Sequence, residues 1–190
     1  METLSRLFGS ELRVRMMRLF LFNPGQSFDP EAIGRKTQGT KREVAKELDF
    51  LRKTGLVRKK KGVQLWSLEP RFEFMEALSD FLVRTHSLER KEILRKIEKT
   101  GRIKAVLVAG IFTKDPESRL DLLVVGDHVK AGVLDRVVKS IESDMGKDIR
   151  YALLTASDFA YRQGMNDKLV RDVLDYPYEA LVDKIGLSQA

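Results

Sequence analysis

The sequence predicts an α+β protein with two domains joined by a linker helix. The chain has 190 residues, of which 43% are hydrophobic, so it can bury a substantial core. Its first third reads as amphipathic helices followed by a strand pair, whereas the remainder alternates apolar strands with helices. We therefore expect a first domain at residues 1–70, a linker helix at 71–86 and a second domain, with a mixed sheet, at 87–190.

Positive charge is concentrated in the first of these domains. Residues 1–70 contain 15 Lys and Arg against 8 Asp and Glu, whereas residues 71–190 contain 20 of each. The whole net charge of +7 therefore belongs to the first domain. A basic module joined to a neutral one indicates that the basic module binds a polyanion.

Composition excludes several kinds of site. The chain has no cysteine and two histidines, so thiolate zinc sites, iron–sulfur clusters and multi-histidine metal sites are not expected. We expect neither a cofactor nor a bound metal. No apolar run reaches the roughly 18 residues of a membrane-spanning helix, and the first residues lack the apolar stretch of a signal peptide. We therefore expect a cytoplasmic protein that does not bind a membrane.

The elements of the first domain can be located from caps and periodicity. Residues 4–22 carry apolar side chains at helical spacing and predict one helix. Asp29 and Pro30 suit the N-cap and first position of a second helix that runs to about residue 37. A third helix begins at Thr40, with Glu43 three residues later as in a capping box. Residues 56–68 then alternate like the two strands of a hairpin.

This order of elements is similar to that of a known family. Helix, helix, short turn, helix and hairpin, with the run KELDFLRKTGLVRKKKG at the end of the third helix, resembles the winged helix-turn-helix family of bacterial and archaeal transcription regulators. The resemblance covers roughly residues 4–69. It implies a homodimer that binds double-stranded DNA, with the third helix in the major groove and the hairpin on the backbone.

Two groups of residues are the candidate DNA contacts. The first lies near the start of the third helix, where side chains can reach base edges: Thr40, Lys41, Arg42 and Lys46. The second lies at the hairpin tip, where cations can contact phosphate: Arg58, Lys59, Lys60 and Lys61. Two alternatives remain open: these charges are solvated surface, or the domain is an adaptor that binds protein.

The segment at 71–99 is expected to be helical, with a break near His86-Ser87. It carries an apolar stripe made of Phe72, Phe74, Met75, Leu78, Phe81 and Leu82. The stripe either packs as core or linker, or forms a dimer seam, and the sequence leaves both open. We assign no role to His86.

In the second domain, apolar runs predict strands at 103–109, 119–125 and 149–155. Helices are expected at 129–145, after a cap at Ser157 or Asp158, at 166–174 and at 178–185.

One stretch of this domain, VLVAGIFTKDPESRLDLLVVGD, resembles the core motif of the nucleotidyltransferase superfamily. In that family a Gly-Ser pair holds the triphosphate, and two aspartates with a third carboxylate bind two Mg²⁺ ions. Gly110 matches the glycine and Asp121 the second aspartate, but Ile111 stands at the serine and Arg119 at the first aspartate. The third strand offers no interior carboxylate.

These departures predict a domain without catalytic residues and without a metal. Residues 119 and 121 would share one face of a strand, so we expect Arg119 to pair with Asp121 instead of leaving a carboxylate pair for Mg²⁺. The domain would serve dimerisation, partner binding or sensing of a nucleotide or protein effector. The alternative is an active Mg-dependent nucleotidyltransferase that uses the winged helix to find its substrate.

Overall fold

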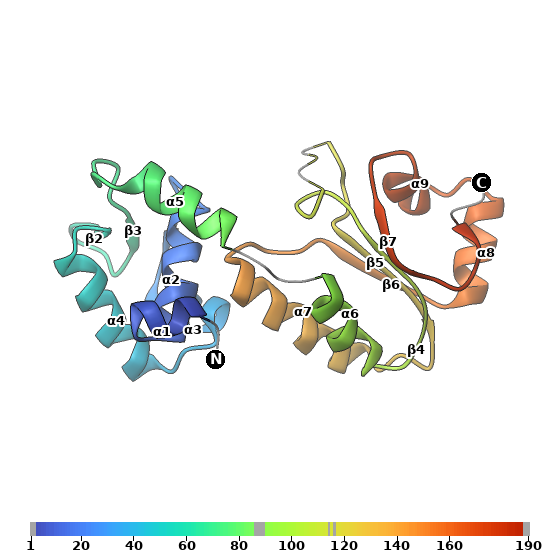
Figure 1. The fold of residues 1–190 in the computed structure, drawn as a ribbon, viewed down its shortest axis with the longest axis horizontal. Helices are drawn as coiled ribbons and strands as arrows, with labels where there is room; N and C mark the ends of the chain where they lie inside the picture. The colour runs from blue at the N-terminus through green and yellow to red at the C-terminus, as the bar shows by residue number, and fades with distance from the viewer. Residues whose placement is uncertain (1–2, 86–89, 114, 116, 188–190) are drawn as a thin grey trace. The chain divides into compact units, whose positions relative to one another are not determined.

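The computed structural model describes residues 3–85, 90–113, 115 and 117–187, which fold as a mixed α+β protein (Figure 1). The chain divides into two compact units. The first unit is Met1–Leu88 with Lys139–Lys147, and the second unit is Glu89–Val138 with Asp148–Ala190. None of the helices among the described residues has the length and apolar character that crossing a bilayer requires.

Residues up to 85 form eight elements of the first unit. They are α1 (Thr3–Phe8), α2 (Glu11–Leu21), β1 (Ser27–Phe28), α3 (Pro30–Thr37), α4 (Lys41–Lys53), β2 (Val57–Lys59), β3 (Trp66–Leu68) and α5 (Met75–Arg84). The chain from residue 90 onward forms α6 (Arg90–Glu98), β4 (Arg102–Val108), β5 (Leu122–Asp127), α7 (Ala131–Met145), β6 (Tyr151–Leu154), α8 (Ala156–Gly164), α9 (Lys168–Leu174) and β7 (Glu179–Asp183).

The first helix predicted at 4–22 is two helices, so that prediction was wrong in detail. Gly9 breaks the segment by adopting φ +75°, a conformation that costs glycine little. Ser10 is then extended and acts as the N-cap of α2, where its side chain accepts a hydrogen bond from the Arg13 amide at 3.2 Å. Apolar spacing alone does not reveal this break.

The next two helices begin where the sequence predicts. Asp29 caps α3, with its Oδ1 accepting from the Ala32 amide at 2.7 Å, and Pro30 occupies the first helical position. Thr40 caps α4, and the capping box with Glu43 is present. Gln38, at the end of α3, has φ 56° and turns the chain toward α4.

The predicted hairpin forms part of a three-stranded sheet in the order β1-β3-β2. Strands β2 and β3 are antiparallel, with Val57 opposite Leu68. The short β1 also pairs antiparallel with β3, with Ser27 opposite Ser67, and no sequence pattern predicted it. A two-residue strand is too short to show alternation.

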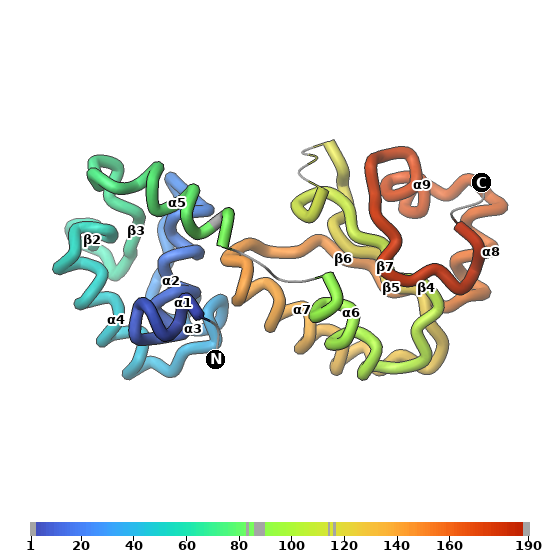
Figure 2. The backbone as a smooth tube through the Cα atoms, viewed as in Figure 1, coloured from blue at the N-terminus to red at the C-terminus, as the bar shows by residue number. Residues whose placement is uncertain are grey.

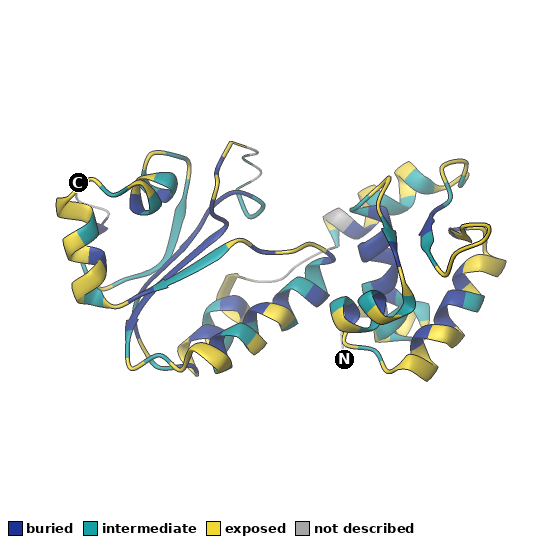
Figure 3. Cartoon of the chain, turned by 180° about the vertical axis from the view of Figure 1, so that it is seen from behind, coloured by how far each residue is buried: buried dark blue, intermediate teal, exposed yellow. Residues whose placement is uncertain are grey.

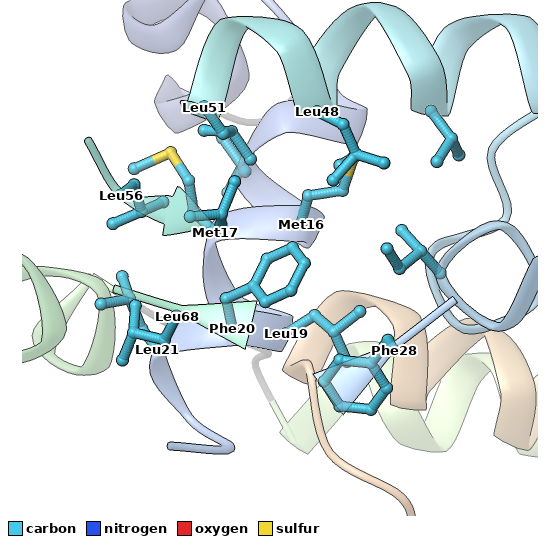
Figure 4. Packing of buried hydrophobic residues seen from close by; sticks show 14 of the residues in the cluster. Met16, Met17, Leu19, Phe20, Leu21, Phe28, Leu48, Leu51, Leu56 and Leu68 are labelled. Atoms are coloured by element: carbon cyan, nitrogen blue, oxygen red, sulfur yellow. The ribbon is translucent and has the colours of Figure 1, made fainter. Parts of the chain in front are cut away.

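The core of the first unit surrounds α2, whose side chains are buried around much of the helix (Figure 4). Met16 and Phe20 are fully buried there. The ring of Phe20 meets the ring of Phe28 edge-on, with centroids 5.9 Å apart. Leu48 and Leu51 of α4 close the core from a second side. This packing fixes α4 against the body of the unit.

The helical segment predicted at 71–99 is shorter than expected. Helix α5 begins at Met75, and residues 71–74 form turns instead. Helix α6 begins at Arg90. The break expected near His86-Ser87 lies outside the described residues.

The second unit is built on a mixed four-stranded sheet in the order β6-β5-β4-β7. Figure 2 traces the backbone of these four strands. Strand β4 pairs antiparallel with β5 and with β7, whereas β5 and β6 are parallel. Leu107 and Leu123 face a cluster that includes Phe159 of α8 and Val173 of α9. Since alternate residues such as Val106 are buried as well, both faces of the sheet are covered (Figure 3).

Two predicted elements of this unit differ from the structure. Strand β5 begins at Leu122 instead of 119, which leaves Arg119 and Asp121 in the preceding loop. The helix predicted at 178–185 is absent, and Glu179–Asp183 forms the edge strand β7 because this segment pairs with β4, with Val182 opposite Val106. The cap of α8 is Thr155, whose side chain accepts from the Asp158 amide, instead of Ser157 or Asp158.

The first unit also contains Lys139–Lys147. The sequence predicted this segment as the end of the helix at 129–145 and therefore as part of the second domain. Arg18 of α2, 2% exposed, donates from Nη1 to the Asp144 carbonyl oxygen at 2.8 Å. Asn23 Nδ2 donates to the Gly146 carbonyl oxygen at 2.7 Å. The last carbonyls of a helix have no partners within the helix, so these donors bind its C-terminal end favourably.

Candidate nucleic-acid interface and the surroundings of Asp121

The start of α4 is fixed by its capping box. Thr40 donates from its backbone amide and its hydroxyl to Glu43 Oε2, at 2.9 and 2.6 Å. These bonds from the Thr40 hydroxyl and backbone hold the pKa of Glu43 below its usual value. Thr40 therefore orders the first turn of α4, and its hydroxyl proton is engaged there.

The exposed face of α4 carries unpaired cations in its first two turns. Val44, Leu48 and Leu51 face the core, which leaves Lys41, Arg42 and Lys46 exposed. Within the described part of the chain, none of these three cations is paired with a carboxylate. Their charge is available to a ligand.

The last turn of α4 is different, because one carboxylate is paired with both of its cations. Asp49 accepts from Arg52 Nη2 at 2.9 Å and lies 2.7 Å from Lys53 Nζ. The hydrogen bonds from Lys53 and then Arg52 lower the pKa of Asp49. Unpaired positive charge on α4 is thus concentrated at its N-terminal half.

The hairpin adds a second group of cations. Lys59, Lys60 and Lys61 are exposed, and none has an acidic partner among the residues that the structure describes. The Lys60 amide donates to the Leu65 carbonyl oxygen at 2.8 Å, which closes the turn. Arg58 differs from the three lysines, because its Nε lies 4.0 Å from Glu69 Oε2.

A buried ion pair ties α4 to α2, and sequence reasoning missed it. Arg13 Nε donates to Glu47 Oε2 at 2.8 Å, with side chains 18% and 7% exposed. The Arg13 guanidinium also stacks 3.6 Å from the centre of the Phe50 ring. A signal was present: Glu47 falls on the apolar face of α4 with Val44 and Leu48, where a carboxylate needs a cationic partner.

In the second unit, Asp121, the residue that the resemblance aligns with a metal ligand, is saturated with hydrogen-bond donors. The residue is 1% exposed. Its Oδ1 accepts from the Ile111 amide at 3.0 Å and from Arg150 Nη2 at 2.8 Å. Its Oδ2 accepts from the Arg150 amide and Nε, both at 2.9 Å.

The predicted pairing of Arg119 with Asp121 was therefore wrong, and Arg150 takes that place. Arg119 lies in the loop before β5 and is exposed, so it does not share a strand face with Asp121. Arg150 is adjacent because β6 runs parallel to β5, with Tyr151 opposite Leu122. This pairing can be predicted from the sequence only if the strand order is already known.

The electrostatics of Asp121 follow from these bonds. Burial raises the pKa of this carboxyl, but hydrogen bonds from the Arg150 side chain and backbone and from Ile111 outweigh it and hold the pKa below its usual value. The same pairing raises the pKa of Arg150. Gly110, at φ 52°, lies so close that a Cβ there would overlap Asp121 Oδ1.

This arrangement does not resemble a divalent-metal site. Each carboxylate oxygen of Asp121 already accepts two hydrogen bonds, so a metal would have to displace the guanidinium. Among the described residues, no group of three or more acidic or histidine side chains is placed to hold a metal ion. Comparison of the chain with protein-family models, curated proteins and solved structures finds no match.

Proposed function

We propose that the first unit is a winged helix-turn-helix that binds double-stranded DNA, and that the chain is a transcription regulator. One arrangement carries the proposal: exposed cations without acidic partners among the described residues are grouped at the start of α4, as Lys41, Arg42 and Lys46, and at the tip of the hairpin that follows it. Exposed cations without acidic partners among the described residues also occur in the second unit, at Lys91, Lys99 and Lys130, so the proposal depends on the placement of the first unit's cations on one helix start and one hairpin tip. Unpaired cations on a helix and a neighbouring hairpin suit a polyanion.

The two groups of cations would have different roles. A helix fits the major groove, and residues of its first turns reach base edges, so Lys41 and Arg42 would read sequence. The hairpin lysines Lys59, Lys60 and Lys61 would contact phosphate and supply affinity independent of sequence. The core packing of α4 and its capping box hold the reading helix in a fixed place.

A salt titration of duplex binding tests this proposal. In the full chain, changing Lys59, Lys60 and Lys61 to Ala should weaken binding to specific and random duplexes alike. The slope of log K against log salt should flatten by about 0.9 for each phosphate that the variant no longer neutralises.

The matched control removes the same charge from the second unit. Lys91, Lys99 and Lys130 are exposed and have no acidic partner in the described part of the chain, so their change to Ala should leave the slope nearly unaltered. An unchanged slope in the hairpin variant, or an equally flattened slope in the control, would contradict the binding of phosphate by the hairpin.

We further propose that the regulator is a homodimer that pairs through α5 and the residue before it. Phe74, Ala77 and Phe81 are exposed at spacings of three and four, with Phe74 59% and Phe81 39% exposed. Such a stripe is typical of a helix–helix seam. Sedimentation should give a dimer for the unmodified chain and a monomer for Phe74→Glu. A monomeric unmodified chain at tens of micromolar concentration would oppose the proposal.

We propose that the second unit is a catalytically inactive nucleotidyltransferase-like domain that senses an effector or binds a partner. The support is the saturation of Asp121 by Arg150 and Ile111, which leaves its oxygens no free position for Mg²⁺. Ile111 in place of serine removes a hydroxyl that the resemblance assigns to phosphate binding.

A further inference from the structure

The first unit contains an apolar pocket of about 350 Å³ that DNA binding does not use. Leu7 and Phe8 of α1 form one side of it, Phe50 and Leu51 of α4 another, and Phe72 and Leu78 a third. The volume falls within the range of small-molecule sites in proteins, about 300–1,000 Å³. None of the candidate DNA contacts lines this pocket.

The pocket offers no free charge to an occupant. Arg13 is the one charged residue among the described residues that line it. Its guanidinium is already engaged, with bonds to Glu47 Oε2 at 2.8 Å and Oε1 at 3.4 Å and to the Phe8 carbonyl oxygen at 2.7 Å. A charged ligand would lose its hydration without gaining a partner, so the pocket selects against charge.

The rim of the pocket is apolar and open to water. Leu7 is 69% exposed and Phe50 is 41% exposed. Apolar area gains about 25 cal/mol per Å² when it is removed from water, so an apolar occupant is favoured. The rings of Phe8 and Phe72 already meet Phe81 and Phe74 edge-on, and Arg13 stacks on the ring of Phe50, so the lining favours an apolar occupant without selecting an aromatic one.

We propose that this pocket is a binding site for an uncharged, apolar small molecule. Its occupant would contact the last turn of α4 through Phe50 and Thr54, and also Leu56, the residue before β2. The site is therefore next to both elements that carry the unpaired cations. The binding site itself is independent of the proposed DNA function, because it uses none of those cations.

Titration of the full chain with the uncharged fluorophore N-phenyl-1-naphthylamine tests the site without any DNA. The unmodified chain should give saturable fluorescence enhancement with one site per chain. Leu7→Gln removes the exposed apolar rim and should weaken binding about fivefold to tenfold. Thr54→Phe places a ring in the pocket from an exposed position and should weaken binding by more than about tenfold.

Val63→Gln is the matched control, because Val63 is an exposed apolar residue of the first unit that does not line the pocket. It should bind the probe like the unmodified chain, and circular dichroism should show that all variants are folded. Non-saturable binding, or equal binding by all four proteins, would overturn the proposal. So would a dimer in sedimentation that Leu7→Gln dissociates, because a second copy would then cover the pocket.

Discussion

Replacing Asp121 by Asn changes one atom at the best-satisfied polar group of the second unit. The aspartate accepts one backbone amide and one guanidinium N–H at each of its two oxygens. Asparagine keeps one acceptor oxygen and places an NH₂ group at the other position. In either orientation of the amide, one backbone N–H and one guanidinium N–H lose their acceptor and face a donor.

The expected cost follows from which of these donors can find water. The side chain of Arg150 is 50% exposed, so its freed N–H can turn to solvent and contributes little. The backbone amides of Ile111 and Arg150 cannot move without distorting the chain. Losing one hydrogen bond from a backbone amide to a charged acceptor costs about 1.5–3 kcal/mol. We expect Asp121→Asn to destabilise the protein by about 2–3 kcal/mol at pH 7.

Urea denaturation followed by far-UV circular dichroism measures this cost. Asp172→Asn is the matched control, since Asp172 is half-buried in the same unit and has no partner among the described residues. It should change stability by less than about 0.5 kcal/mol.

The pH dependence gives a second, independent readout. The folded pKa of Asp121 is lowered, so its stabilisation is complete above the unfolded pKa of about 3.9 and is lost as the pH falls through the folded pKa. The difference in the free energy of unfolding between the unmodified chain and Asp121→Asn should therefore become smaller below about pH 4. A difference in the free energy of unfolding under about 1 kcal/mol at pH 7, or a difference that stays constant down to pH 2, would show that the charged Asp121 does not stabilise the fold in this way.

Three further predictions concern the reading helix and catalysis. Arg42→Ala should relax the sequence preference in a selection from random duplexes. If the guanidinium reads a guanine, the loss of binding free energy should be about 1–3 kcal/mol. A lower affinity with an unaltered sequence preference would make Arg42 a phosphate contact. Thr40→Ala should destabilise the protein by about 1 kcal/mol in urea titration, whereas Thr40→Ser should retain the cap. The full chain should incorporate no labelled nucleotide with Mg²⁺ or Mn²⁺, and Arg119→Asp should not restore activity, because Asp121 remains bound to Arg150. Turnover by the unmodified chain that disappears in Asp121→Ala would contradict this last expectation.

The parts of the fold that the sequence predicted correctly depend on local chemistry. The starts of α3 and α4 are marked by Asp29 and Thr40, whose side chains bond amides three residues away. Such signals lie within one helical turn and do not depend on the rest of the chain. The strand predicted at 103–109 is likewise recognisable as β4, because residues 105–109, which are buried on both faces of the sheet, are an uninterrupted apolar run.

The parts that the sequence did not predict depend on contacts distant in sequence. Strand β7 is a strand because β4 has a free edge for it, and Val182 alone does not indicate this. Arg150 reaches Asp121 because β6 lies parallel to β5, a strand order that no local pattern contains. Which cations of α4 lack an acidic partner also depends on geometry, because the sequence shows acidic and basic residues on that helix but does not show which of them form ion pairs.

The first unit is discontinuous in the chain, because Lys139–Lys147 belongs to it, and this restricts how the gene can be recombined. A fragment that ends after α5 retains the buried Arg18 but lacks the Asp144 carbonyl that accepts its hydrogen bond. The same fragment lacks Gly146, whose backbone lies against Arg18 and Leu19, so a part of α2 that is buried in the full chain becomes exposed to water. A single crossover near Leu88 would transfer an incomplete unit to a new protein. We therefore expect such a transfer to give a less stable first unit than one that keeps both segments of the chain.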